Sequence, residues 1–508
     1  MRILLASTAL GTLAALSAPA FAAETTISTA VTTPVLTNGN DIRITSTGSV
    51  KPTGGAAVTI NSSNSAKNEG TIAIKGANSA TGILANTNLT GDITNSGTIT
   101  IDEDFTGTDT DKDGDLDGPF AQGTDRFGIH VLGGGTYTGN IVNSGSITIE
   151  GNASAGIAVD SALTGSLTTT GKISVIGNDS VGVRTGAISG NVIIGNASST
   201  VVQGQNSVGV SLGGDVGGAF VIQGTILSTG YRSTTPPADT SKLDSDDLLQ
   251  GGSAVVVGGS VAGGILLDTR PADNSTTDTD EDDDGIPDAS ETTASVTSAG
   301  AAPAMVIGSA TQDINIGQVG TSGQGIINKG TILGTGIYAG VSATGLSISG
   351  TGHAVNVTGG LTNTGTIAAK SLDTNATAIH IGAGASVPQI VNGGTISADG
   401  AGTDGSAAQA IVIDTGATVN AITNSGTIAA TRLGDKGTAA AIVDHSGTLA
   451  LVQNNGQIGV SNASCRGSVM TSPQCVCRTS RNRCSSRRVW FSPTIAPPMS
   501  AAPPNAKR

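Results

Sequence analysis

The stretch GDITNSGTITI at residues 91–101 joins two short alternating apolar segments through an Asn-Ser-Gly corner. The same phrase returns as GNIVNSGSITI at residues 139–149 and as AITNSGTIAA at residues 421–430. Looser copies occupy residues 67–74, 327–333, 361–369, 390–398 and 452–460. The corner glycines of neighbouring copies are mostly 26 to 32 residues apart, and a period of this length indicates a repeat architecture.

Each repeat contains two further short apolar segments. A second apolar segment lies between corners, as in AGIAVD at residues 155–160, and a third short apolar run precedes many corners. Side chains alternate along each segment, so Ile99 and Ile101 face one side of their strand while Thr98 and Thr100 face the other. Stacked coils bury such apolar faces in one core and pair each backbone with the coils above and below.

These features predict an all-β fold, a right-handed parallel β-helix solenoid of about a dozen three-strand coils. A helical alternative fails because the apolar spacing is two, and because Gly, Thr, Ser and Asn are poor helix formers. We expect Gly and Asn at the corners to adopt the left-handed backbone conformations that sharp turns need.

Residues 1–22 have the pattern of a secretory signal peptide, with Arg2, an apolar run over residues 3–16 and the small-x-small site Ala20-Phe21-Ala22. We expect cleavage after Ala22. The alternative is a membrane anchor, but the apolar run is short and rich in alanine. The repeats occupy residues 23–462, which contain no cysteine, so backbone ladders and a stacked core must hold them together without disulfides.

The composition fits an exported, extended protein. Glycine accounts for 75 of 508 residues and aromatic residues for 2%, which argues against an ordinary globular core. The hydrophobic fraction is still 37%, so the chain has enough apolar residues to fold. The net charge of −14 argues against binding to nucleic acid or to anionic membranes.

Three polar insertions interrupt the repeat at residues 102–126, 229–250 and 268–300. Insertions in a repeat array normally map to loops on one side of the rod. The first and third contain aspartates at alternate positions around a glycine, a pattern that wraps oxygen ligands around a hard cation such as calcium.

The third insertion matches a calcium loop more completely than the first. Its predicted ligands are Asp280, Asp282, Asp284, the carbonyl of Ile286, Asp288 and Glu291, at loop positions one, three, five, seven, nine and twelve. This pattern resembles an EF-hand-type or thrombospondin type-3 loop. In the first insertion the predicted ligands are Asp109, Asp111, Asp113, Asp115 and Asp117, but Phe120 stands at position twelve. The alternative for both insertions is a solvated acidic loop.

The sequence favours a protein that is not an enzyme. The four histidines, His130, His353, His380 and His445, all fall in second-strand phrases, and no Ser or Cys partner recurs with them. Asp160, Asp414 and Asp444 each close such a phrase, but Asp160 lies many coils from the other two. The alternative is a β-helical polysaccharide lyase or hydrolase, which needs charged residues clustered on one strand face.

The signal peptide, the NSGTITI and SAGIAV phrases, and DLLQGGSAVVVGGSVAGGILLD at residues 247–268 resemble the passenger of a bacterial autotransporter, of the type V secretion family. The resemblance covers about residues 1–462. It implies export to the periplasm and delivery to the cell surface by a C-terminal outer-membrane β-barrel. It also implies a role in adhesion, aggregation or biofilm formation, although some passengers are enzymes.

Residues 463–508 depart from that family. They contain all four cysteines, the single tryptophan and seven arginines, with no Asp or Glu and no alternating membrane strands. We interpret this segment as the product of a frameshift or truncation, with a genuine basic tail as the alternative. In either case we expect it to be disordered.

The predicted function is that of a structural or adhesive rod with calcium-binding loops. The expected partners are an outer-membrane translocator barrel, missing from this chain, and host, bacterial or abiotic surfaces, with glycans as one candidate ligand. The expected location is the cell surface or the extracellular space if an intact barrel exists, and the periplasm otherwise.

Overall fold

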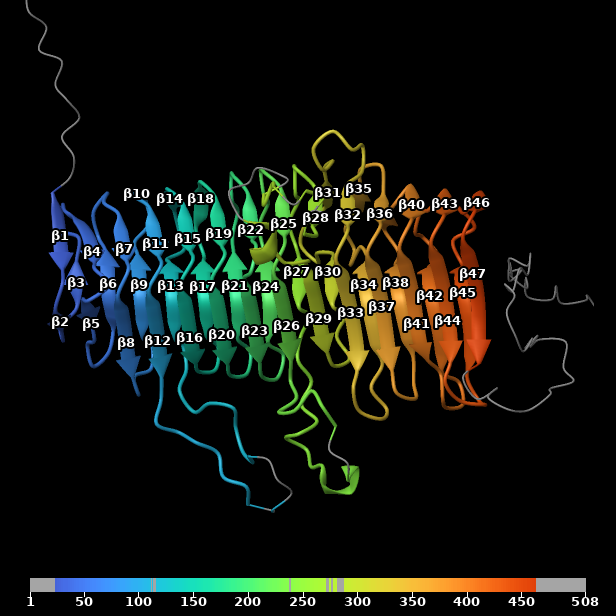
Figure 1. The fold of residues 1–508 in the computed structure, drawn as a ribbon, viewed down its shortest axis with the longest axis horizontal. Coiled ribbons are helices and arrows are strands. Elements are labelled where there is room, and N and C mark those ends of the chain that lie inside the picture. The colour runs from blue at the N-terminus through green and yellow to red at the C-terminus, as the bar shows by residue number, and fades with distance from the viewer. Residues whose placement is uncertain are drawn as a thin grey trace, which may run out of the picture.

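Three parallel β-sheets run side by side along the chain and enclose one long apolar core (Figure 1). The computed structural model describes residues 23–110, 112, 116–236, 239–270, 274–275, 277–280 and 287–462. The first and second sheets have 14 strands each and the third has 13. Each coil of the chain adds one strand to each sheet, so the predicted parallel β-helix is confirmed.

Neighbouring strands of a sheet are one coil apart in the chain. The first sheet contains β1 (Glu24–Ile27), β4 (Asp41–Ile44), β7 (Ala66–Asn68), β11 (Ile93–Asn95), β15 (Ile141–Asn143), β19 (Leu167–Thr169), β22 (Val192–Ile194), β25 (Phe220–Ile222), β28 (Ile265–Leu267), β32 (Ile326–Asn328), β36 (Leu361–Asn363), β40 (Gln389–Asn392), β43 (Ala421–Asn424) and β46 (Leu451–Asn454). The second sheet contains β2 (Ala30–Val31), β5 (Ser49–Val50), β8 (Thr71–Lys75), β12 (Thr98–Asp102), β16 (Ser146–Glu150), β20 (Lys172–Ile176), β23 (Ser199–Gln203), β26 (Thr225–Thr229), β29 (Ser295–Ala299), β33 (Thr331–Gly336), β37 (Thr366–Ser371), β41 (Thr395–Gly400), β44 (Thr427–Arg432) and β47 (Gln457–Asn462). The third sheet contains β3 (Val35–Leu36), β6 (Ala56–Ile60), β9 (Thr81–Ala85), β13 (Phe127–Val131), β17 (Ala155–Val159), β21 (Val181–Thr185), β24 (Val208–Leu212), β27 (Val255–Val257), β30 (Met305–Ile307), β34 (Ala343–Ile348), β38 (Ala376–Ile381), β42 (Ala407–Ile413) and β45 (Thr438–Asp444). Two three-stranded sheets flank these, one of β10 (Leu89–Thr90), β14 (Thr136–Thr138) and β18 (Ala162–Thr164), the other of β31 (Ile314–Ile316), β35 (Val355–Val357) and β39 (Ala385–Ser386).

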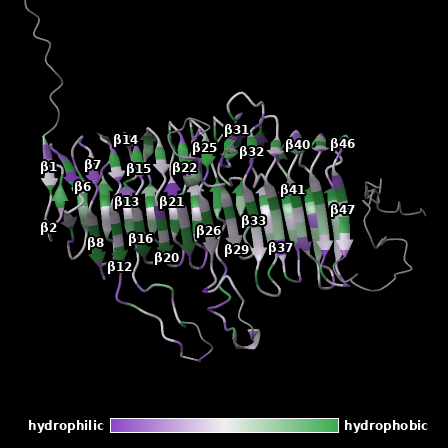
Figure 2. Cartoon of the chain, viewed as in Figure 1, coloured by the Kyte–Doolittle hydropathy of each residue, from purple (hydrophilic) through white to green (hydrophobic). Residues whose placement is uncertain are grey.

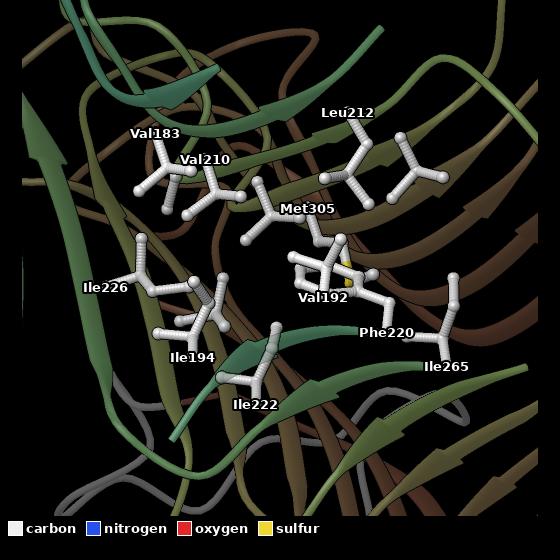
Figure 3. Packing of buried hydrophobic residues seen from close by; sticks show 14 of the residues in the cluster. Val183, Val192, Ile194, Val210, Leu212, Phe220, Ile222, Ile226, Ile265 and Met305 are labelled. Atoms are coloured by element: carbon white, nitrogen blue, oxygen red, sulfur yellow. The ribbon is translucent and has the colours of Figure 1, made fainter. Parts of the chain in front are cut away.

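The core is built from stacks of equivalent residues. In the second sheet, Ile99 of β12 is paired in register with Ile72 of β8 and with Ile147 of β16. All three side chains are fully buried. In the middle coils, Val192, Phe220 and Met305 are among the side chains that fill the interior between the sheets (Figure 3). Burial of one such side chain stabilises the fold by about 1.5–3 kcal/mol, so the stacks are the main source of stability.

A second kind of stack lies at the end of each strand of the first sheet, before the corner that leads into the second sheet. We call this the ladder position. In chain order it is occupied by Ile27, Ile44, Asn68, Asn95, Asn143, Thr169, Ile194, Ile222, Leu267, Asn328, Asn363, Asn392, Asn424 and Asn454. Between successive asparagines, the side-chain amide of one donates to the amide oxygen of the next at 2.7 Å.

The corner glycines are required for close approach rather than for an unusual backbone angle. A Cβ atom on Gly145 would overlap the carbonyl oxygen of Gly97, the equivalent glycine one coil earlier. The φ angles of both glycines lie outside the left-handed region, so the prediction of left-handed glycines at these corners is wrong. Left-handed residues occur at other turns, among them Ala153 and Asp179.

The first and second insertions leave the rod at the same corner, between the second and third sheets (Figure 1). The third insertion follows β28 and precedes β29, and therefore lies between the first and second sheets. The expectation of one shared side holds for two insertions and is wrong for the third. In Figure 2 most of the green, hydrophobic colouring lies along the strands, whereas the projecting loops are largely purple and white.

The second insertion is attached by a small core of its own. Tyr231 and Tyr338 are buried, and their rings meet edge to face with centroids 4.7 Å apart. The hydroxyl of Tyr338 donates to the carbonyl oxygen of Ser233 at 3.0 Å. Two short 3₁₀ helices, η1 (Thr240–Lys242) and η2 (Asp288–Ser290), lie in the second and third insertions.

The described strands run from Glu24 to Asn462. The predictions of a signal peptide at residues 1–22 and of a disordered tail at residues 463–508 fall outside the described residues. Within the described part of the chain, no helix has the length and hydrophobicity needed to cross a bilayer.

Candidate functional site

The first insertion is fastened to the rod by a buried ion pair. Arg126 is 1% exposed, and its Nη1 lies 2.9 Å from Oε2 of Glu103, whose side chain is 8% exposed. Glu103 also accepts hydrogen bonds from the backbone N–H groups of Gln122 and Gly123, at 2.6 and 2.7 Å. Both ends of the loop therefore converge on one carboxylate. Removing one partner of such a buried pair typically costs about 3–5 kcal/mol.

The far end of the first insertion meets the second insertion. Carboxylate oxygens of Asp117, Asp244 and Asp246 lie within 4.8 Å of one another. Arg232 neutralises part of this charge, with Nη2 placed 3.2 Å from Oδ2 of Asp246. The backbone N–H of Gly118 donates to the same oxygen at 2.9 Å. The sequence pattern located acidic residues in each insertion, but the contact between the two loops arises only because both leave the same corner.

The described end of the third insertion folds back onto the rod. The N–H of Asp288 donates to the carbonyl oxygen of Thr279 at 2.9 Å, which closes the loop. The side chains of Asp288 and Glu291 are buried, with exposures of 3% and 7%. Asn196, at a corner of the rod, donates to Oε1 of Glu291 at 2.7 Å. The backbone N–H of Glu291 donates to the carbonyl oxygen of Asp288 at 3.1 Å, so one turn of backbone joins the predicted ninth and twelfth ligands.

Six of the predicted calcium ligands lie outside the described residues: Asp111, Asp113, Asp115, Asp282, Asp284 and Ile286. Asp109, in contrast, is placed, and it accepts a hydrogen bond from the N–H of Lys112 at 2.6 Å. Asp280 adjoins Thr279, where the third insertion closes. Calcium binding by these loops therefore stays a prediction.

A column of hydroxyl side chains runs along the outward face of the second sheet. We call it the hydroxyl column; in register it contains Thr71, Thr98, Ser146, Lys172, Ser199, Thr225, Ser295, Thr331, Thr366, Thr395 and Thr427. Lys172 is the single exception among these eleven coils. Successive members are about 4.8 Å apart, the spacing of neighbouring strands.

A polar cluster lies on the outward face of the third sheet. Nε2 of His130 lies 2.9 Å from Oδ2 of Asp160, and Arg184 binds both oxygens of the same carboxylate at 2.9 Å. The ring of Phe127 stacks on His130 with centroids 4.2 Å apart. Partial burial raises the pKa of Asp160, but hydrogen bonds and charge from Arg184 and His130 outweigh this and hold that pKa below its ordinary value.

The same face carries an equivalent pair seven strands further along the sheet. Nε2 of His380 lies 2.7 Å from Oδ2 of Asp414. These histidines and aspartates lie in recognisable strand phrases of the sequence, but their pairing was not predicted because each pair joins adjacent coils. The signal was available: both aspartates follow their histidines by about one repeat, 30 residues for Asp160 and 34 for Asp414.

A family model described as the BigA third pectate lyase-like domain matches residues 11–198, which is less than half of the chain. No curated protein and no solved structure matches the chain. The match agrees with the β-helix described above and supports an exported β-helical protein of the passenger type. The description of this family as pectate lyase-like argues against the prediction that the chain is not an enzyme, but it establishes no activity.

Proposed function

We propose that the chain is an exported surface rod that adheres to other surfaces through its outward faces. The observation that carries this proposal is the hydroxyl column, which spans eleven adjacent coils and has a hydroxyl side chain in ten of them. Each hydroxyl both donates and accepts hydrogen bonds. A regular row of such groups suits many weak contacts with an extended partner, such as a glycan on a host or bacterial cell, or an abiotic surface.

We further propose that an outer-membrane translocator barrel delivers the rod to the cell surface. The resemblance to autotransporter passengers supports this partner, and the match to a BigA domain is in keeping with it. If no barrel accompanies the rod, we expect it in the periplasm.

Beads coated with the purified chain test adhesion directly. We expect them to retain bacterial or epithelial cells, or to bind polystyrene. Thr331→Lys combined with Thr395→Lys should reduce retention several-fold, because two charges interrupt the hydroxyl column. Lysine is compatible with this position, since Lys172 occupies it naturally.

A matched control places the same charges on another face. Thr362 and Thr423 are half-buried, outward residues of the first sheet. Thr362→Lys combined with Thr423→Lys should leave retention unchanged. Equal loss in both double variants, or no retention by the original chain, would contradict adhesion through the hydroxyl column.

We also propose calcium as a ligand of the insertions. In the third insertion the closed backbone at Thr279 and the buried carboxylates of Asp288 and Glu291 support this assignment. In the first insertion the supporting observation is the proximity of Asp117 to Asp244 and Asp246. Calcium would cross-link these loops to the rod, and binding should be weak, as in other extracellular modules.

Calorimetric titration of the full chain with calcium tests this proposal. We expect heat at millimolar calcium and slower proteolysis of the third insertion. Glu291→Gln, which keeps the shape of the side chain but removes its charge, should weaken binding about tenfold or more. Asp404→Asn, in an exposed pair with Lys436, is the control. No heat and no protection would contradict calcium binding.

A polysaccharide-active enzyme is the second candidate function. The observation that favours it is the cluster of His130, Asp160 and Arg184, which falls within the residues matched by the pectate lyase-like model. Incubation with pectate should then release unsaturated or reducing ends, and Arg184→Gln should abolish that release. Absence of products from the original chain would exclude this function for that substrate.

A further inference from the structure

Three side chains with complementary chemistry stand in three adjacent coils on the outward face of the third sheet. Ser347 of β34 is paired in register with His380 of β38, and Asp414 directly follows β42 in the next coil. The hydroxyl oxygen of Ser347 lies 3.4 Å from Nδ1 of His380. On the other side of the ring, Nε2 lies 2.7 Å from Oδ2 of Asp414.

The geometry assigns one donor or acceptor role to each nitrogen of His380. A carboxylate only accepts, so Nε2 of His380 carries a proton and donates it to Asp414. Nδ1 is then the acceptor for the hydroxyl proton of Ser347. The contact between serine and histidine is longer than an ideal hydrogen bond, as is common for catalytic pairs before substrate binds.

The backbone holds the three residues in place. The N–H of Asp414 donates to the carbonyl oxygen of Ile381 at 2.9 Å, and the N–H of Gly382 donates to that of Ile348 at 2.8 Å. These backbone hydrogen bonds between adjacent strands join the three coils immediately beside Ser347, His380 and Asp414. The side chains of His380 and Asp414 are 33% and 41% exposed, so a ligand can reach them from solvent.

We propose that Ser347 is a nucleophile activated by His380 and oriented through Asp414, and that it takes the acyl group from an ester. The hydroxyl oxygen of Ser347 would attack the ester carbonyl carbon while His380 accepts the hydroxyl proton. The bond from that carbon to the alcohol oxygen then breaks, and His380 returns the proton to the departing alcohol. The products are an acylated Ser347 and a free alcohol, and water later releases the acyl group as a carboxylic acid.

The open position of the site defines the class of substrate. Because His380 and Asp414 face solvent on the outside of a sheet, an acyl group on an extended molecule, such as an O-acylated polysaccharide, can reach Ser347. Water rather than enclosed donors would stabilise the oxyanion, so turnover should be slow. Acylation or phosphonylation of Ser347 is therefore the readily measured step.

The other histidine–aspartate pair provides an internal comparison. His130 and Asp160 have the same relation across two coils, but the residue paired with His130 in the preceding coil is Leu84. That pair therefore has no nucleophile where Ser347 stands in the second pair. The matched control for His380→Gln is His353→Gln, at a histidine whose Nδ1 lies 3.3 Å from Oδ1 of Asp313.

The test is labelling of the full chain with a fluorophosphonate probe, followed by peptide mass spectrometry. We expect Ser347 to be labelled on the order of 100-fold faster than other exposed serines. Ser347→Ala should remove the adduct, and His380→Gln should slow labelling by a similar factor. Asp414→Asn should slow it about tenfold or more, whereas His353→Gln should leave the rate unchanged. Far-UV circular dichroism and the urea midpoint verify that each variant is folded.

Two results would overturn the proposal. One is a folded chain in which Ser347 reacts no faster than other serines. The other is labelling of Ser347 that persists in folded His380→Gln and Asp414→Asn variants, since a nucleophile that needs neither residue is not activated by them. Hydrolysis of p-nitrophenyl acetate that disappears in Ser347→Ala would support the complete acyl-transfer sequence.

Discussion

The ladder position holds an amide in some coils, a hydrocarbon side chain in others and a threonine in one, and corners longer than two residues follow only the hydrocarbon side chains. After every asparagine at this position, as after Asn95 and Asn392, two residues connect the first sheet to the second. After Ile44 and Ile194 the corner has four residues, and after Leu267 the third insertion begins. Two-residue corners also follow Ile27, Thr169 and Ile222, so a short corner accompanies every amide but does not by itself select one.

The hydrogen bonds of the asparagines explain this relation. Nδ2 of Asn392 donates to the carbonyl oxygen of Gly394 in its own corner at 3.2 Å, and to that of Thr427 in the next coil at 3.1 Å. It also donates to Oδ1 of Asn424 at 2.7 Å. These partners are in place only if successive corners have the same length. Hydrocarbon packing is non-directional and tolerates irregular corners.

Ile222 is informative because its own corner is short. It stands between Ile194 and Leu267, whose corners are longer, so no neighbouring amide is available to it. Regularity over several coils, rather than in one, therefore determines where an amide ladder can form.

The largest expected effect comes from placing an amide in the hydrocarbon segment. Ile222→Asn should lower the free energy of unfolding by about 4 kcal/mol, because it loses apolar burial and buries an amide without a ladder partner. Urea unfolding followed by far-UV circular dichroism measures this change. Ile222→Val, which keeps the hydrocarbon, should cost only about 1 kcal/mol. Equal losses in the two variants would show that the segment does not discriminate against amides.

The regular corners should be intolerant of a methyl group. Gly145→Ala should lower the free energy of unfolding by about 3 kcal/mol, because the new Cβ overlaps the carbonyl oxygen of Gly97. The control is Gly459→Ala, where a Cβ meets no atom within 4 Å. Thermal unfolding of both variants compares them, and a Gly145→Ala chain as stable as the control would refute close stacking at this corner.

Loss of one rung from the ladder should have a smaller effect. Asn392→Ala removes hydrogen bonds to Asn363 and Asn424 and should cost about 2 kcal/mol. Asn454 ends the ladder and is exposed, so Asn454→Ala should cost less than about 1 kcal/mol. Chemical denaturation resolves the difference, and equal costs would mean that the buried ladder adds nothing beyond surface hydrogen bonds.

The smallest effect concerns pH, because amide ladders are neutral whereas the cluster around Asp160 titrates. The pKa of Asp160 is held below its ordinary value in the folded state. Its stabilising contribution is therefore present above the unfolded pKa, about 3.9, and is lost as the pH falls further through the folded pKa. Asp160→Asn should lower the free energy of unfolding by less than about 1 kcal/mol at pH 7. It should also make the free energy of unfolding depend less steeply on pH at acidic pH. Urea unfolding at a series of pH values measures this dependence, and an unchanged slope at acidic pH would contradict a stabilising role for ionised Asp160.

The repeat architecture could be predicted from the sequence because its signals are local. Alternating residues in TITI specify an inward and an outward face, and the NSG corner recurs with each coil. The reason for the corner glycines could not be predicted in the same way. It depends on the distance between Gly145 and Gly97, residues 48 positions apart that only the stacked structure brings together.

The candidate sites were less accessible for the same physical reason. The acidic motif around Asp280 is contiguous in sequence, so it could be recognised and assigned to calcium. The contact of Asp117 with Asp244, and the alignment of Ser347 with His380, depend on which coils are neighbours and on where loops leave the rod. Aligning successive repeats strand by strand would have placed Ser347 beside His380. The same alignment says nothing about the first and second insertions, which lie outside the repeat.

A double-mutant cycle at Asn392 tests the relation between corner length and ladder residue most directly. One change is Asn392→Ile, and the other replaces residues 393–394 by the four-residue corner of residues 195–198. With the original corner, Asn392→Ile should destabilise the rod, whereas with the longer corner the same change should be neutral or stabilising. We expect a coupling free energy of about 1–2 kcal/mol. Equal effects of Asn392→Ile in both backgrounds would show that corner length does not determine whether an amide or a hydrocarbon occupies the ladder position.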